Sequence, residues 1–188
     1  MSQKKITLDD FLIETSRLKI RNLKETDLPA FHKYRSEPDI AKYQGFGIFS
    51  LEQAMEFIME QKKKCLGVPG EWIQYGIEDI TMFQLVGDCA IKLQDPDPRI
   101  AEIGITIAKP FQRHGYAREV MQGLLNHLFK ENGILRIVET VDSENIASIQ
   151  LMKSLGFRQE VNINENILFK GRLVSEFQFV LLKQEWEK

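Results

Sequence analysis

The chain has 188 residues, 43% hydrophobic and 28% charged, and its 25 basic and 27 acidic residues give a formal net charge of −2. These values fit one soluble domain with a full hydrophobic core, and they lack the basic surplus of a nucleic-acid-binding protein. No apolar run approaches the roughly 18–20 residues needed to span a bilayer, so we expect one domain over 1–188 that binds neither nucleic acid nor membrane.

The N-terminal part of the chain predicts a strand and then a helix. Apolar and charged residues alternate over 17–22, which is the pattern of a half-buried strand. Thr26 and Asp27 are suited to cap a helix that runs to about Arg35, and Pro29 is tolerated in its first turn.

A second helix is predicted from Ser50 onward. Ser50 and Gln53 stand three residues apart, in the sequence pattern of a capping box. The residues that follow repeat with helical spacing and form one apolar face, and the glycines and proline at 67–70 end the helix. The apolar face consists of Leu51, Ala54, Met55, Ile58 and Met59.

The middle of the chain predicts three strands, at about 71–78, 84–92 and 101–108. A short turn separates the first two, so they are expected to pair antiparallel. A strong amphipathic helix follows the third strand and ends at Asn132-Gly133, a pair typical of a left-handed helix stop. Its apolar positions are Ala117, Val120, Met121, Leu124, Leu125, Leu128 and Phe129.

The C-terminal part completes a mixed α/β sheet. A strand at 135–141 follows the helix directly, and a strand, helix and strand joined by short loops indicate a parallel crossover. A short helix at about 146–155 and strands at about 157–163 and 173–182 are predicted beyond it. We therefore expect antiparallel strands in the N-terminal half and a parallel strand-helix-strand unit in the middle.

The loop before the long helix is the segment most suited to chemistry. Gly115 and Ala117 are small residues at the point where the loop enters the helix, so backbone N–H groups there could approach an anion closely. The first helical turn has unpaired N–H donors and a partial positive charge, which favour phosphate. The alternative is an ordinary strand-to-helix turn in which the glycine serves only backbone geometry.

Four motifs in order resemble the GNAT acetyltransferase superfamily. Residues 112–117 (Gln-Arg-His-Gly-Tyr-Ala) match its Gln/Arg-x-x-Gly-x-Gly/Ala signature, and residues 101–107 are similar to its central strand. Residues 145–157 match the Asn-x-x-Ser/Ala … Leu-Gly-Phe block, with the family's spacing. The opening at 15–21 resembles the subgroup of ribosomal-protein N-terminal acetyltransferases. The resemblance covers about 14–182 and implies a GNAT-like acyl-CoA N-acyltransferase fold.

The resemblance implies that acetyl-CoA is the cosubstrate. In this family the signature loop holds the coenzyme pyrophosphate, mainly through backbone atoms, and the pantetheine arm lies between two splayed strands. A strand amide then stabilises the oxyanion, and Gly104 would serve a bulge or a close backbone approach. The implied coenzyme-binding residues are Ile105, Ile107, Gln112, Arg113, His114, Gly115, Tyr116, Ala117, Asn145 and Ser148.

The block that begins at Asn145 is expected to contact the pantetheine arm and the sulfur. Asn145 is the family's polar contact to the arm, although asparagine is equally suited to cap the following helix. Ser148 stands where its hydroxyl could face the coenzyme sulfur. Many relatives have a proton-donating tyrosine where this chain has Met152, which cannot donate a proton. The candidate donor is therefore Ser148 or water.

Glu102 is the leading candidate for the general base. An ammonium acceptor must lose a proton before its nitrogen can attack. By the alternation of a strand, Glu102 shares a face with Gly104 and Thr106, and relatives with a glutamate at this place often use it as the base. The alternative is a solvated carboxylate at a strand edge, and Glu160 is a weaker second candidate.

The acceptor site of the family is built by the N-terminal helices and their loop, here roughly 31–64. The aromatic residues Tyr43, Phe46 and Phe49 could line a pocket there or pack beneath the loop. The acceptor is expected to be a protein N-terminal α-amine or a small-molecule amine, with direct attack in a ternary complex. Many relatives form homodimers, but no segment of this sequence marks an interface.

Two other classes of function compete with the acetyltransferase. A non-catalytic acyl-CoA-binding sensor would bind the coenzyme without turnover, and Met152 gives that alternative its basis. A different nucleotide-binding protein would need glycine or Lys-Ser/Thr features that this loop lacks. Cys65 and Cys89 have no metal-ligand spacing, and no apolar signal sequence is visible, so we expect reduced thiols, no metal and a cytoplasmic protein.

Overall fold

A single mixed sheet of eight strands forms the centre of the computed structural model, which describes residues 12–188 and the side chains of all of these except 161–166. The strands lie in the order β1-β2-β3-β4-β5-β6-β8-β7. They are β1 Leu12–Glu14, β2 Leu18–Asn22, β3 Trp72–Asp79, β4 Gln84–Leu93, β5 Ile100–Ile107, β6 Arg136–Asp142, β7 Arg158–Phe169 and β8 Arg172–Leu182.

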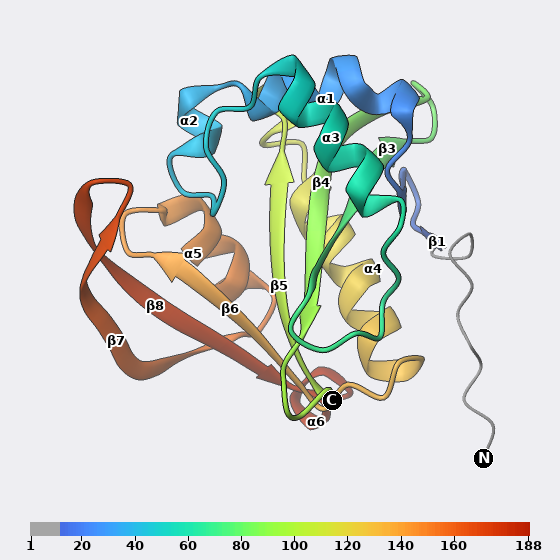
Figure 1. Ribbon diagram of the computed structural model, residues 1–188. Helices are drawn as coiled ribbons and strands as arrows, with labels where there is room; N and C mark the ends of the chain where they lie inside the picture. The colour runs from blue at the N-terminus through green and yellow to red at the C-terminus, as the bar shows by residue number, and fades with distance from the viewer. Residues whose placement is uncertain (1–11) are drawn as a thin grey trace.

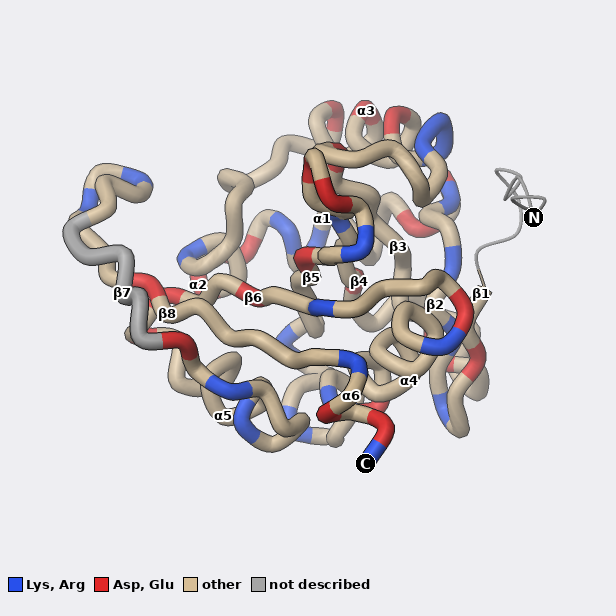
Figure 2. Tube along the Cα trace, turned by 90° about the horizontal axis from the view of Figure 1, so that it is seen from below, with Lys and Arg blue, Asp and Glu red and all other residues tan. Residues whose placement is uncertain are grey.

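Helices cover both faces of the sheet. Helices α1 and α3 lie over one face, and α4 and α5 lie over the other (Figure 2). The helices are α1 Leu28–Arg35, α2 Pro38–Ala41, α3 Leu51–Gln61, α4 Tyr116–Lys130, α5 Ile146–Ser154 and α6 Lys183–Trp186, with short 3-10 turns at Glu25–Asp27 and Lys109–Phe111. The apolar side of α4 is buried in a large core cluster with alternate residues of β3, β4 and β5.

Strands β5 and β6 are the parallel pair that the crossover predicted. Their pairing covers only Ile100↔Arg136, Ala101↔Ile137 and Glu102↔Val138. Beyond that point the two strands diverge, and β6 turns away with β8 while β5 continues beside β4 (Figure 1). The mixed sheet, antiparallel at its N-terminal end with one parallel pair, is confirmed.

Several local predictions agree with the structure and others do not. The capping box of α3 forms in both directions, with Ser50 Oγ accepting from the Gln53 N–H at 3.2 Å. Asp27 stands at the N-cap of α1 but makes no side-chain cap bond. Instead its carboxylate pairs with Arg21 of β2 at 2.8 Å, because a buried carboxylate is stabilised most by a charged partner. The short elements β1, α2 and α6 were not predicted.

A buried ion pair joins α1 to the sheet. Arg35 is 1% exposed and donates to the carboxylate of Asp88, on β4, from Nη2 at 2.8 Å and from Nε at 3.1 Å. Tyr34 Oη and Gln74 Nε2 donate to the same carboxylate, each at 2.5 Å. Burial, followed by the charge of Asp88, raises the pKa of Tyr34 well above its usual value. The side chains of Arg35, Tyr34 and Gln74 therefore all depend on one carboxylate.

Candidate active site

The loop that enters α4 has the backbone shape of an anion site. Gly115 is the N-cap of α4 with φ of 80°, and Arg113 also has a positive φ of 65°. No side chain caps the helix, so its first-turn N–H groups keep their capacity to bind a ligand. The left-handed backbone conformation at position 115 explains why a glycine stands there, since other residues rarely adopt this conformation.

Side chains in this loop serve the protein's own structure. Gln112 donates from Nε2 to the carbonyl of Ile107 at 2.9 Å, and Nδ1 of His114 lies 2.8 Å from the Gln112 carbonyl. Tyr116 donates to Asp79 at 2.5 Å, and this bond lowers the pKa of Asp79 and raises that of Tyr116. The polar atoms of the Gln112, His114 and Tyr116 side chains are thus engaged within the protein itself.

Arg17 is a residue beside this loop that the sequence analysis missed. Its guanidinium lies 4.6 Å from the centre of the Tyr116 ring, and its Nη1 donates to the His114 carbonyl at 3.1 Å. Its Nε and Nη2 both contact Glu119 Oε2 at 2.7 Å. The family-like opening at 15–21 was the available signal, because it contains Arg17. This contact ties the N-terminal strands to the first turn of α4.

We predict that Glu119→Gln lowers stability in a pH-dependent manner. Burial acts to raise the pKa of Glu119, but hydrogen bonds from Thr15, Arg17 and Ser16 outweigh it and lower that pKa. A lowered folded-state pKa means stabilisation that is present above the unfolded value of about 4.3 and is lost as pH falls through the folded value. Urea unfolding should give a lower free energy of unfolding for the variant than for the wild type at pH 7. This difference in free energy should shrink as the pH falls toward 3. A constant difference at every pH would contradict this.

The amide groups of β5 alternate between its two neighbours. Gln94 N–H donates to the Ile100 carbonyl and Ala108 N–H donates to the Val86 carbonyl, so even-numbered residues of β5 bond to β4. Because backbone groups alternate along a strand, the amides of Ile103, Ile105 and Ile107 face the side of β6. Pairing with β6 ends at Glu102, and these three amides therefore border the diverging gap.

Gly104 does not form a bulge. Strand β5 runs in continuous register with β4 through the pair Gly104↔Ala90, so the bulge alternative was wrong. A Cβ built at Gly104 would meet no atom within 4 Å. The glycine thus borders open space on the strand face that it shares with Glu102, which is consistent with the close-approach alternative.

Asn145 caps the start of α5, which is the alternative role that the sequence analysis gave it. Asn145 Oδ1 accepts from the Ser148 N–H at 3.2 Å, and both residues are partly buried. Met152 is fully buried in the large core cluster with Ile149 of the same helix. The structure therefore gives Asn145 a capping role and places Ser148 in the first turn of α5.

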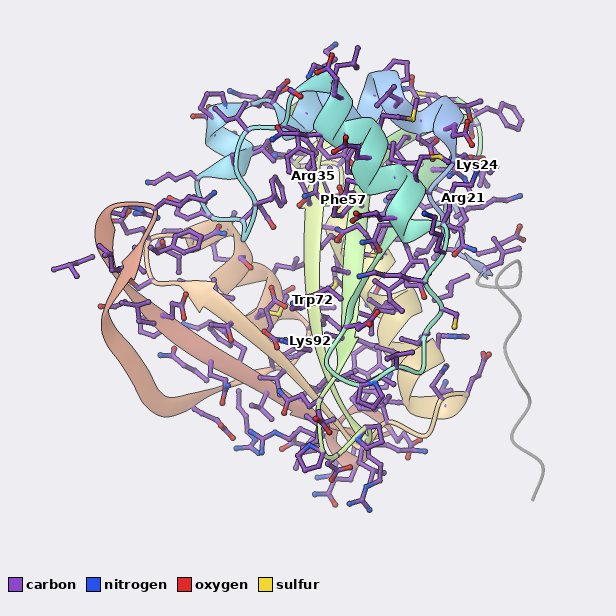
Figure 3. The ribbon with its side chains drawn as sticks, viewed as in Figure 1. Arg21, Lys24, Arg35, Phe57, Trp72 and Lys92 are labelled. Carbon is purple, nitrogen blue, oxygen red and sulfur yellow. The ribbon has the colours of Figure 1, made fainter. Side chains whose placement is uncertain are left out.

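A pocket of about 370 Å³ contains Glu102. Glu102 pairs with Lys92, its direct neighbour on β4, through Oε2 at 2.6 Å, and its side chain is 21% exposed. Lys92 Nζ also lies 4.7 Å from the centre of the Trp72 ring, and Figure 3 shows these two side chains together beside the strands. Glu102 is therefore on a central strand with a cationic partner rather than at a strand edge.

The three predicted acceptor-site aromatics divide between the two roles that the sequence left open. Tyr43 lines the pocket. Phe46 and Phe49 instead pack around the buried Arg35, whose guanidinium carbon lies 3.6 Å from the centre of the Phe46 ring. Figure 3 shows Arg35 and Phe57 beneath the helices. The remaining pocket residues are Gly45, Thr140, Asp142, Phe169 and Glu176.

The C-terminal half contributes pocket walls that the sequence analysis missed. Lys170, in the turn between β7 and β8, donates to the carbonyls of Ala41 and Phe46, so the hairpin meets the N-terminal loop. Arg172 pairs with Asp142 at 2.5 Å and with Glu144 at 3.0 Å. The Lys170 contacts join segments more than a hundred residues apart, and those of Arg172 join segments about thirty apart, so no local sequence pattern reports them.

Glu160 lies away from this pocket. It pairs with Arg136 at 3.1 Å and lies 4.0 Å from Arg158, and it is absent from the pocket lining. Among the residues whose side chains the structure describes, 12–160 and 167–188, no group of three or more His, Cys, Asp or Glu side chains is arranged to hold a metal ion. Over the same described range, no helix has both the length and the apolar character needed to cross a membrane.

Comparison with known proteins places the chain among acetyltransferases. Residues 17–158 match the family described as acetyltransferase (GNAT) domain. Uncharacterized N-acetyltransferase p20 of Bacillus licheniformis is 30% identical over 92% of this chain and 96% of its own length. The solved structures that share the fold include two that were determined with coenzyme A. RimL, a ribosomal α-N-protein acetyltransferase solved with coenzyme A, has a TM-score of 0.78 at 18% identity, covering 92% of this chain and 98% of that one. Spermidine N-acetyltransferase from Vibrio cholerae, solved with CoA and spermine, has a TM-score of 0.77 at 22% identity, covering 92% and 99%.

Proposed function

The chain belongs to the GNAT acetyltransferase family, and on that premise we propose that it transfers the acetyl group of acetyl-CoA directly to a primary amine. One observation carries the proposal. The diverging gap between β5 and β6 adjoins an anion-suited helix N-terminus at one end and Glu102 at the other. Such a gap can align a long thioester with a base. The proposal treats 1–188 as one catalytic domain.

Several features of the chain fit a bound acetyl-CoA. The uncapped N–H groups at Gly115 and in the first turn of α4 suit the pyrophosphate, with Gln112, Arg113, His114, Tyr116 and Ala117 around it. The amides of Ile105 and Ile107 face the gap, where they could bond to the pantetheine arm. The open space beside Gly104 leaves room for the acyl group. We therefore assign coenzyme binding to this gap.

The acceptor amine is proposed to approach from the pocket. An ammonium group entering there meets the carboxylates of Glu102, Asp142 and Glu176, and Glu102 would take its proton directly or through water. The neutral nitrogen then attacks the thioester carbonyl, while the amide of Ile105 stabilises the oxyanion. Asn145 and Ser148, at the start of α5, are proposed to contact the arm and the sulfur.

The acceptor class is tested by comparing products. The fold is shared by a protein α-N-acetyltransferase and by a spermidine acetyltransferase, so overall likeness does not choose between them. Purified protein should be incubated with acetyl-CoA and either unmodified N-terminal peptides or small primary amines, followed by mass spectrometry. The opening motif at 15–21 favours the peptides. Coenzyme binding without any acetylated product would support the sensor alternative instead.

We predict that Glu102→Gln lowers kcat/KM by about 100-fold or more, because loss of a general base typically costs that much. Steady-state kinetics with the best acceptor provide the measurement. Glu160→Gln is the matched control, since Glu160 is a carboxylate on the edge strand β7 that lies outside the pocket. An equal loss in both variants, or none in Glu102→Gln, would remove Glu102 from the mechanism.

A further inference from the structure

Glu139 is a buried carboxyl that the proposed mechanism does not use. It lies on β6, one residue past Val138, where the pairing with β5 ends. It is 8% exposed, and its Oε2 is buried without a hydrogen-bond partner. An unpartnered buried polar atom is costly and uncommon in a folded protein, so its retention at the apex of the diverging strands calls for an explanation.

The side chain of Glu139 lies on the face of β6 that α5 covers. Residues 137, 139 and 141 share one face by the alternation of a strand, and Ile137 and Val141 belong to the large core cluster. Phe179, directly opposite Glu139 on β8, belongs to the same cluster. Met152 of α5 is also a member. Glu139 thus occupies the layer that contains Met152, where many relatives have their proton-donating tyrosine.

The surroundings of Glu139 favour the protonated form of its carboxyl. Burial, followed by the negative charge of Glu102, raises the pKa of Glu139 well above its usual value. The neighbouring members of the cluster on β8 and α5 are apolar. Arg136 is on the opposite face of β6 and pairs with Glu160. The raised pKa favours the neutral form of Glu139, which has an O–H group to donate.

The diverging strands also determine what reaches this carboxyl. Figure 1 shows β5 and β6 converging toward one end, which is where Ile100–Glu102 pair with Arg136–Val138. The loop that ends at Gly115 follows the opposite end of β5 in the chain. A coenzyme whose pyrophosphate lies at that loop extends its arm toward the apex. The thioester is the end of the arm, so the proposed binding mode would bring it toward the apex, where Glu139 lies one residue past the last paired residue of β6.

We propose that Glu139 is a further catalytic residue, the acid that protonates the sulfur of coenzyme A as the acetyl group leaves; this rests on the proposed function. The amine nitrogen forms a C–N bond to the carbonyl carbon, and the C–S bond breaks with its electron pair on sulfur. The Glu139 proton then forms the S–H bond. Of the two protons lost by the ammonium, one goes through Glu102 to solvent and the other restores Glu139.

This assignment fits the residues present better than the earlier candidates. Met152 has no acidic proton, and the hydroxyl of Ser148 is a far weaker acid than a carboxylic acid. A general acid works best when its pKa lies near the working pH, which a buried glutamate can satisfy. Ser148 then remains a hydrogen-bonding contact to the sulfur.

Glu139→Gln tests the proposal because glutamine has the same shape and is neutral, as the protonated carboxyl is. We expect kcat to fall by about 100-fold, with an unchanged Kd for acetyl-CoA by calorimetry. A general acid acts only below its pKa, so wild-type kcat should decline at alkaline pH and the variant should lack that limb. A kcat within threefold of wild type, with the alkaline limb kept, would overturn the proposal.

A second measurement does not depend on turnover. Carbon-13 NMR of protein labelled at glutamate carboxyls should show one signal that is still protonated at pH 7 and is missing from Glu139→Gln. If every glutamate has ionised by pH 6, Glu139 is not the acid. The two proposals fail separately: a wild type that acetylates no amine refutes the proposed function, whereas an active wild type with an equally active variant refutes only this inference.

Discussion

Replacing Gly115 with glutamate is expected to abolish acetyl-CoA binding, with Kd raised by more than about 100-fold. Gly115 has φ of 80°, and the first N–H groups of α4 follow it. The new side chain would bring a negative charge to the positive end of the helix, where the pyrophosphate is proposed to bind, and two like charges at close range repel strongly. Calorimetric titration of acetyl-CoA into both proteins measures the effect.

Gly133→Glu is the matched control for this substitution. Gly133 also has a positive φ, of 70°, but follows the other end of α4. The control therefore introduces the same charge and similar backbone strain far from the signature loop, and its Kd should stay at the wild-type value. Equal binding by wild type and Gly115→Glu would place the coenzyme elsewhere. A wild type that does not bind acetyl-CoA would remove the basis of the proposed function.

Asp88→Ala is expected to destabilise the fold by about 3–5 kcal/mol, the usual cost of removing one partner from a buried ion pair. Arg35 is 1% exposed and Asp88 is fully buried, so the guanidinium would remain in the interior without a counter-charge. Tyr34 and Gln74 would also lose their acceptor. Urea unfolding at pH 7, followed by circular dichroism, gives the free energy of unfolding for both proteins.

Asp39→Ala provides the comparison for the buried pair. Asp39 forms an ion pair with Lys109 at 3.0 Å, but both side chains are largely exposed. Solvent screens such a pair, so the unfolding midpoint should not change measurably. A similar loss of stability in both variants would show that burial does not set the strength of these interactions.

Local sequence patterns predicted much of the fold. The capping box at Ser50, the long helix α4 and the crossover from β5 to β6 each depend on neighbours in the sequence. The signature loop was also predicted, because the backbone conformation that a glycine adopts at a helix start is a local property of the sequence. Asn145 was suited to a helix cap for equally local reasons, and the structure shows that cap.

Contacts across the sheet were decided by the tertiary structure. The partner of Glu102 follows from the register of β4 and β5, which places Lys92 opposite it. The pocket walls from β6 and β8, and the contact of Arg17 with the signature loop, join distant parts of the chain. Sequence analysis also passed over Glu139, since burial of one carboxyl depends on the strands and helix around it. The sequence thus determined the secondary-structure elements and the family. The tertiary structure decided which charged side chains meet, because strand register and packing depend on residues far apart in the chain.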